Sequence, residues 1–152
     1  MEDQRLNEAE LLRSLVGQEL SAVRRINYVL PDGSCDRREG PLELTVRSEL
    51  TVRLDSSSDG ESLHVEQGQW EDPFRGSLSP ENIAFLKTAG KWTAFDVSGD
   101  NEYRSMIGRS IEQVKFVTRA GKTVGVDIVI SAAVIRAEVV ADELVVDLVR
   151  GS

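Results

Sequence analysis

One pattern occurs at two distant places in this chain. Residues Arg13–Ile26 read RSLVGQELSAVRRI, and residues Arg104–Val117 read RSMIGRSIEQVKFV. Arginine, serine and glycine coincide in place, with the glycine at Gly17 and Gly108, and most apolar positions keep their class. Apolar residues have helical spacing before the first glycine and follow a strand pattern after both. We therefore expect a short helical segment, a glycine with positive φ at its end, and then a strand, in both places.

Alternating apolar and polar residues extend the similarity downstream of both segments. The pattern predicts two pseudo-repeats, at approximately residues 7–67 and 98–149, each with a short helix and about four strands. The fold class expected is α+β with mainly antiparallel strands. A chance match of short segments remains the alternative. The separation between equivalent positions shrinks only across loops, which tolerate length changes: it is 91 residues at Gly17/Gly108, 83 at Val52/Ile135 and 81 at Leu63/Leu144.

The connector at 68–97 contains one predicted helix and one short strand. Ser79 can cap the helix, Pro80 suits its first position, and Gly90 ends it. A strand-like segment follows at 91–97. No disordered linker separates the copies, so we expect one domain over residues 1–152 with a shared core. Because aromatics make up 5% of the chain, that core must consist mainly of Val, Leu and Ile.

The charge restricts the classes of partner. The net charge is −8 and the isoelectric point is near 4.7. Nucleic acids and anionic membrane surfaces require a basic face, so neither is expected as a partner. A basic protein is compatible with this charge, and a homo-oligomer is open. The lone Cys35 cannot form an internal disulfide, and the N-terminal residues have no apolar signal segment, which favours a reducing, cytoplasmic setting.

Residues with catalytic or metal-binding chemistry are sparse. His64 is the one histidine, and it lies on a predicted strand rather than in a ligand or triad motif. Asp55–Glu66 matches the bare spacing of a calcium loop, but Ser62 stands where an apolar residue belongs and the flanks read as strands. Gly121 to Thr123 lacks the upstream glycine of a phosphate-binding loop. We predict no catalytic residue, no cofactor and no metal, and the sequence favours a non-enzymatic protein.

The stretch Trp70–Phe74 places two aromatics around two acids and a proline. Aromatic residues are enriched at the centres of protein interfaces, so this connector is a candidate recognition surface. The simpler interpretation is that Trp70 and Phe74 close the end of the core. The complete set of candidate partner-binding residues is Trp70, Glu71, Asp72, Phe74, Trp92, Asp96, Asp100 and Glu102.

The second half of the chain resembles small bacterial proteins of uncharacterised function. The resemblance covers residues 90–147 and rests on Gly90-Lys91-Trp92, Ile107-Gly108 and Asp142-Glu143-Leu144 within GKWTAFDVS, YRSMIGRSIEQVKFV, GKTVGVDIVI and ADELVV. Some such proteins are thought to act as immunity proteins beside secreted toxins. The resemblance implies a small intracellular bacterial protein that binds rather than catalyses, and it carries over no functional residues.

Two functions follow as hypotheses. The first is a non-enzymatic protein-binding module whose acidic surface masks a basic partner, as an immunity-type inhibitor would. The second is a small-molecule-binding protein or weak enzyme with a cleft between the two repeats, lined by Trp92, Asp96 and their neighbours. A pocket with convergent polar groups would favour the second hypothesis, whereas an acidic face without a pocket would favour the first.

Overall fold

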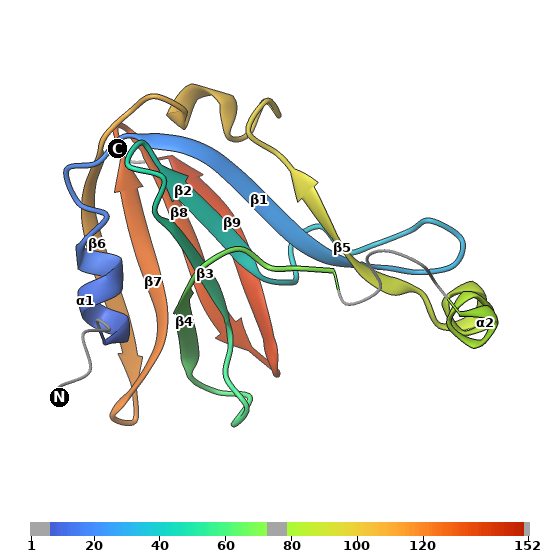
Figure 1. Ribbon diagram of the computed structural model, residues 1–152. Coiled ribbons are helices and arrows are strands. Elements are labelled where there is room, and N and C mark those ends of the chain that lie inside the picture. The colour runs from blue at the N-terminus through green and yellow to red at the C-terminus, as the bar shows by residue number, and fades with distance from the viewer. Residues whose placement is uncertain (1–6, 73–78, 151–152) are drawn as a thin grey trace, which may run out of the picture.

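Two antiparallel sheets form the protein in the computed structural model, which describes residues 7–72 and 79–150 (Figure 1). One sheet has five strands in the order β4-β3-β2-β1-β5, and the other has four in the order β6-β7-β8-β9. The α+β class with mainly antiparallel strands is confirmed. The elements are α1 (Glu8–Arg13), β1 (Leu20–Val29), β2 (Leu42–Val46), β3 (Thr51–Ser56), β4 (Leu63–Gln67), α2 (Pro80–Ala89), β5 (Lys91–Asp96), the 3₁₀ turn η1 (Arg104–Met106), β6 (Ile111–Arg119), β7 (Lys122–Ile130), β8 (Ala133–Val140) and β9 (Glu143–Arg150).

The core lies between the two sheets. Alternate residues of most strands point inward, as in Leu42 and Leu44 of β2 or Ile128 and Ile130 of β7, and these side chains are fully buried. Both sheets and α1 contribute to one continuous apolar cluster, which consists mainly of Val, Leu and Ile. Each predicted strand is present because alternation is a local property that the pleat of a strand converts directly into burial.

Helix α1 is shorter than the predicted segment at 7–16. Asn7 caps it by accepting a hydrogen bond from the Glu10 amide at 2.8 Å. The helix ends at Arg13, after which the amides of Leu15 and Val16 bond three residues back, as in a 3₁₀ turn. Leu15 is nevertheless fully buried, so the tightened turn still places an apolar side chain in the core.

The segments around Gly17 and Gly108 pair with each other. The Gly17 amide donates to the Ile111 carbonyl at 2.7 Å, and the Gly108 amide donates to the Leu20 carbonyl at 2.7 Å. The Leu20 amide reaches the Arg109 carbonyl at 2.9 Å, and the Ile111 amide reaches the Gln18 carbonyl at 2.8 Å. The φ angles of Gly17 and Gly108 are +88° and +84°, so the predicted positive φ is confirmed at both glycines. This junction joins the starts of β1 and β6.

The distal end of β1, β5 and α2 form an arm that projects from the sheets (Figure 1). α2 connects the two halves of the chain, as predicted, but it lies at the tip of the arm, away from the core. The Tyr28 hydroxyl donates to the Ala89 carbonyl and ties the end of the helix to β1. Within the described residues, neither α-helix has the length and apolar character needed to cross a membrane.

Candidate binding groove

Two polar side chains on β1 fix the loop that shapes the candidate site. Although both residues are polar, they face the interior: Arg25 is 4% exposed and Asn27 is 3% exposed. Asn27 donates its side-chain amide to the Glu39 carbonyl at 2.8 Å. The acceptors for the buried Arg25 guanidinium are main-chain carbonyls rather than a carboxylate. Every buried donor and acceptor of these two side chains has a partner. The Arg25 acceptors are the carbonyls of Arg37, Arg38, Gly40 and Pro41, at 3.0–3.4 Å.

The same loop reaches the second sheet. The Gly40 amide donates to the Leu144 carbonyl, and the Val146 amide donates to the Arg38 carbonyl, both at 2.9 Å. The Arg38 side chain pairs with Asp147 at 2.9 Å. These contacts hold the start of β9 beside the distal part of β1, so residues distant in sequence meet there.

Two adjoining hollows lie at this meeting point, with volumes of about 620 and 320 Å³. They share Trp92 and Glu143, and we call the combined surface the acid–aromatic groove. One hollow is lined by Tyr28, Leu30, Ser34, Cys35, Asp36, Glu39, Trp92 and Glu143, and the other by Ile26, Pro41, Asp55, Ser56, Trp70, Trp92, Asp142 and Glu143.

The aromatic side of the groove is held in place by specific contacts. Trp92 is 38% exposed and meets Tyr28 edge to face, with ring centroids 5.4 Å apart. Trp70 is half-buried, and its main chain is held between two paired side chains. The Trp70 amide donates to the buried Glu43 carboxylate, and its carbonyl accepts from Arg24 at 3.0 Å. Arg24 and Glu43 are themselves paired at 2.9 Å.

The charged side chains that line the groove are all acidic. Neither hollow has a Lys or Arg among its lining residues, which is notable because 18 such residues occur in the chain. Burial raises the pKa of Glu143, and so does repulsion from Glu39, Asp55 and Asp142. Burial also raises the pKa of Asp55. The groove therefore holds negative charge at a free-energy cost that a cation would relieve.

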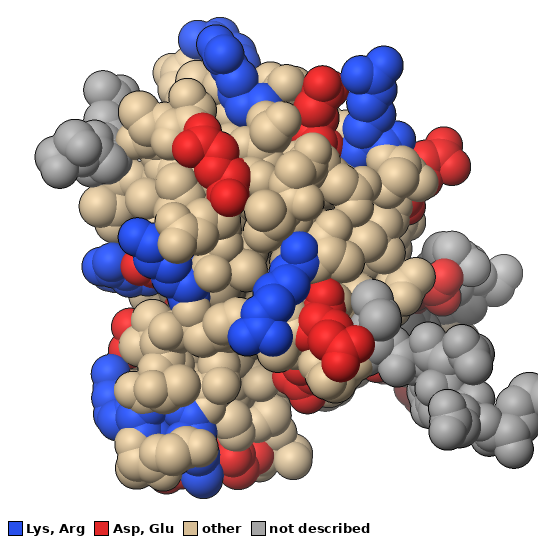
Figure 2. Space-filling model, turned by 90° about the vertical axis from the view of Figure 1, so that its left-hand side faces the viewer, with Lys and Arg blue, Asp and Glu red and all other residues tan. Residues whose placement is uncertain are grey.

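This one-signed lining is a local property. Figure 2 shows the face that carries α1 and β6, where basic and acidic side chains are interspersed. Examples of the mixed pattern are the ion pairs Arg119–Glu138 at 2.8 Å and Arg136–Asp127 at 2.8 Å on the four-stranded sheet. The net charge of −8 is thus not spread evenly over the surface.

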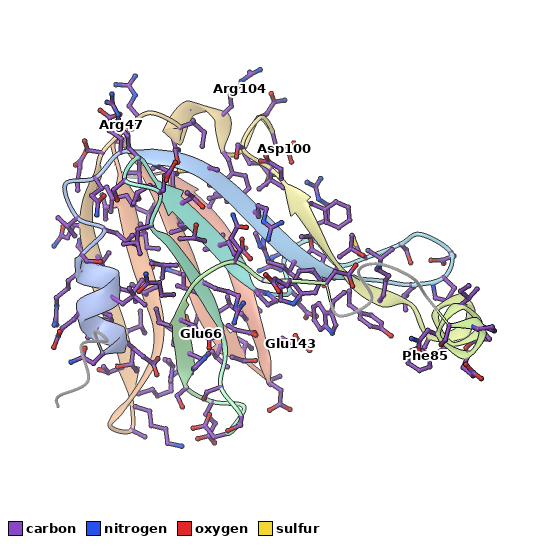
Figure 3. The ribbon with its side chains drawn as sticks, in the orientation of Figure 1. Arg47, Glu66, Phe85, Asp100, Arg104 and Glu143 are labelled. Carbon is purple, nitrogen blue, oxygen red and sulfur yellow. The ribbon has the colours of Figure 1, made fainter. Side chains whose placement is uncertain are left out.

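Another hollow, of about 390 Å³, contains the predicted candidate acids Asp96, Asp100 and Glu102. Arg25 and Arg37 also line it. Arg37 pairs with Asp100 at 3.0 Å, so part of the acidic charge is already neutralised. Asp100 and Glu143 lie on opposite sides of β1 and β5 in Figure 3, and the hollows that they line have one lining residue, Cys35, in common.

The predicted site residues divide between these places. Trp70 and Trp92 come together in the acid–aromatic groove. Glu71 is exposed, and Asp72 pairs with Lys91 at 2.8 Å. Phe74 lies outside the described residues. Trp70 is half-buried and lines the groove, and it does not belong to the apolar core cluster, so the interpretation that it closes the end of the core is not supported.

Several groove residues were missed by the sequence reasoning, among them Tyr28, Glu39 and Glu143. The acidic pair Asp142–Glu143 is visible in the sequence, but acidic pairs are common in an acidic chain and carry little information. The informative fact is that these carboxylates line the same groove as Trp92, and that follows from the contact between the loop and β9.

His64 and the Asp55–Glu66 turn, the other residues considered for catalysis or metal binding, make ordinary structural contacts. His64 lies on β4 with its side chain 42% exposed, between Glu8 and Glu66. Asp59 accepts hydrogen bonds from Ser57, from the Glu61 amide, and from the amide and hydroxyl of Ser62, which hold its pKa far below the ordinary value. Its oxygens therefore organise the turn itself. Across residues 7–72 and 79–150, no three His, Cys, Asp or Glu side chains are grouped so that they could hold a metal ion.

Comparison of this chain with known protein families, curated protein sequences and solved structures found no match.

Proposed function

We propose that the protein is a non-enzymatic binding module that receives a basic partner protein in the acid–aromatic groove. The observation that carries this proposal is the coincidence of exposed Trp92 with five carboxylates and no basic side chain in the lining of one groove. Those carboxylates are Asp36, Glu39, Asp55, Asp142 and Glu143.

A lysine or arginine side chain suits both halves of this lining. Its cationic head can rest on the face of an indole ring, an attraction that grows as water is excluded. The carboxylates supply charge-assisted hydrogen bonds to the same head. The net charge of −8 also steers a basic protein toward the surface, which makes association fast and sensitive to salt. An immunity-type inhibitor of a basic toxin, acting in the cytoplasm, is the role we favour within this class.

Capture of a partner from the source cells, followed by binding measurements with the purified partner, tests the proposal. The decisive variant is Glu143→Gln, with Glu112→Gln on β6 as the matched control because it removes the same charge from the far side of the molecule. We expect Glu143→Gln to weaken binding about tenfold, equivalent to about 1.4 kcal/mol, and Glu112→Gln to leave it nearly unchanged. Association should slow as salt is added. Equal affinity of the wild-type protein and Glu143→Gln would contradict the proposal.

The stability of Glu143→Gln provides an internal control. The pKa of Glu143 is raised in the folded protein, so the folded state holds its proton more tightly than the unfolded state. The contribution of Glu143 to stability therefore falls as pH rises from below its ordinary pKa to above its folded pKa. We expect Glu143→Gln to be more stable than the wild-type protein at pH 7, with the difference shrinking toward pH 4, as measured by thermal unfolding. Weaker binding by a more stable variant cannot result from unfolding.

The volume of the larger hollow supports the alternative function. About 620 Å³ lies within the range of small-molecule sites, so a small cationic ligand could occupy the same surface. The location differs from the predicted cleft, because Trp92 and Asp96 line separate hollows. A variant set that changes affinity for a small amine but not for any protein would favour this alternative.

We also propose that the chain arose by internal duplication of a unit of one helical turn and four strands. The hydrogen bonds at the junction support this, because each bond has a counterpart in which both residues are replaced by their equivalents in the other copy. The equivalent positions are Gly17 and Gly108, Gln18 and Arg109, and Leu20 and Ile111, each 91 residues apart. The strand registers support it as well. Ser56 pairs with Leu63 and Val139 with Leu144, in agreement with spacings of 83 and 81 residues.

Equal effects at the two glycines test the duplication. An added Cβ meets no atom within 4 Å at Gly17 or Gly108, so alanine costs only the strain of positive φ. We expect Gly17→Ala and Gly108→Ala each to lower the free energy of unfolding by about 1 kcal/mol in urea titrations. A large difference between the two losses would argue against equivalent positions.

A further inference from the structure

We infer that the basic partner adds an extended segment to the free edge of β5, as a sixth strand of the five-stranded sheet. This inference rests on the proposed function and specifies how the partner binds. It begins with the register of β5 against β1, which runs without a shift from Lys91 opposite Val29 to Asp96 opposite Arg24. The Val97 amide donates to the Val23 carbonyl at 3.0 Å.

The register determines which main-chain groups face outward. In an antiparallel ladder, alternate residues turn both their amide and their carbonyl toward the neighbouring strand. Val97 bonds to β1, so Thr93 and Phe95 do the same, and Trp92, Ala94 and Asp96 turn their main-chain groups away from β1. In the part of the chain that the structure describes, no other main-chain group bonds to those of Trp92, Ala94 or Asp96.

The other three sheet edges are each covered in part by the chain itself. α1 packs beside β4, where the Glu8 carboxylate accepts from the Val65 amide at 2.9 Å, and it also contacts β6. The start of β6 bonds to Gln18 through the Ile111 amide. The edge of β9 bonds to the loop that contains Arg38 and Gly40. Within residues 7–72 and 79–150, β5 is the edge for which no such main-chain bond is found at any position.

β5 lacks several of the devices that protect free edges. Proteins usually blunt an open edge with proline, a bulge, a very short strand or charged side chains, lysine above all. β5 has six residues, reads KWTAFD, and contains neither proline nor a register shift, and its two charged residues stand at its two ends. Such an edge is a template for main-chain pairing with an extended segment, which is a common mode of peptide recognition.

Exposed apolar side chains gather around this edge. Trp92 is 38% exposed on one face and Phe95 is 40% exposed on the other. Figure 3 labels Phe85 on α2, at the tip of the same arm, and its side chain is 56% exposed. Of the large apolar residues found exposed in the described chain, those on the arm are Tyr28, Leu30, Ile83, Phe85, Trp92 and Phe95, whereas Val16, Val140 and Val149 lie elsewhere.

The charges on both sides of the edge select a basic occupant. Trp92 connects the edge to the acid–aromatic groove. On the other side, Phe95 lines the hollow that contains Asp96 and Glu102, where Arg37 neutralises Asp100 but leaves these two carboxylates. Side chains that alternate from an added strand would meet carboxylates on each face, so the segment should carry Lys or Arg together with apolar residues.

A synthetic peptide tests this mode of binding with the intact protein. The probe is the acetylated peptide amide Lys-Val-Lys-Val-Lys-Val-Lys at low salt, and the readouts are tryptophan fluorescence and residue-resolved amide hydrogen exchange. We expect bound peptide to slow exchange at Trp92, Ala94 and Asp96 at least tenfold. Thr93 and Phe95, whose amides already face β1, should change little. The same peptide N-methylated at alternate residues should bind at least tenfold more weakly.

Ala94→Pro supplies a matched variant. The Ala94 amide faces away from β1, so proline blocks the outer edge without removing a bond of the ladder. We expect this variant to lose at least tenfold in peptide affinity. If the variant does not fold, amide exchange in the wild-type protein decides the matter.

The outcomes separate the two proposals. Binding that weakens in Glu143→Gln but leaves exchange at Ala94 unchanged would overturn strand addition and leave the proposed function in place. Absence of peptide binding would also overturn strand addition, whereas the captured partner and Glu143→Gln decide the proposed function independently. Binding by an added strand of a second copy would appear as a dimer that Ala94→Pro dissociates, and it would overturn the assignment of a basic segment.

Discussion

Arg25→Met should lower the free energy of unfolding by about 3 kcal/mol or more, since it removes charge-assisted hydrogen bonds and leaves buried carbonyls without a donor. The guanidinium is 4% exposed and bonds to four carbonyls of the loop between β1 and β2. Methionine keeps much of the apolar volume, so the loss measures the hydrogen bonds rather than a cavity. Urea titration monitored by circular dichroism provides the measurement.

Arg37→Met is the matched control for this change. Its side chain is 66% exposed and pairs with Asp100, which is 42% exposed. Exposed ion pairs contribute at most about 1 kcal/mol, so the same replacement should have little effect here. Similar losses in the two variants would show that Arg25 does not hold the loop.

Gly40→Ala should have an effect of comparable size, about 3 kcal/mol, through steric conflict and main-chain strain. A Cβ at this position would lie 1.9 Å from the Ile26 carbonyl oxygen, and φ is +126°. The neighbour is main chain of β1, which cannot move without disturbing its pairing with β2 and β5. Trp92 lies 3.3 Å from the same Cβ, so the groove should be disturbed as well.

Gly33→Ala separates strain from steric conflict. Gly33 also has a positive φ, +90°, but nothing lies within 4 Å of its added Cβ. Alanine there should cost about 1 kcal/mol, the strain contribution alone. If both variants lose the same free energy of unfolding, the prediction that Gly40 packs closely against β1 is wrong.

The strands could be predicted because their signal is local. Leu42 and Leu44, or Ile128 and Ile130, alternate with polar residues, and this pattern alone determines which face is buried. The helix at the tip of the arm was likewise predictable from Ser79 and Pro80, since Ser79 Oγ accepts from the Asn82 amide at 3.1 Å.

The groove could not be predicted in the same way. Arg25 and Asn27 are polar residues at inward positions, and their partners are carbonyls of a loop rather than residues with a recognisable motif. Glu143 lines the same hollow as Trp92 because that loop also bonds to β9. Such contacts depend on the packing of distant segments, which periodicity does not encode. Trp70 and Trp92 were predicted because aromatic residues make up only 5% of the chain and are enriched at the centres of interfaces.

The bond between the loop and β9 has a consequence for biosynthesis. Arg38 and Asp147 are separated by 109 residues in the sequence, and the hydrogen bond from the Gly40 amide to the Leu144 carbonyl spans a similar separation. Pairing across such separations is slow because the chain must first lose loop entropy. A nascent chain that has emerged only as far as β8 has no Glu143 and no strand to receive Gly40. The groove is therefore completed late, after nearly all of the described chain has left the ribosome.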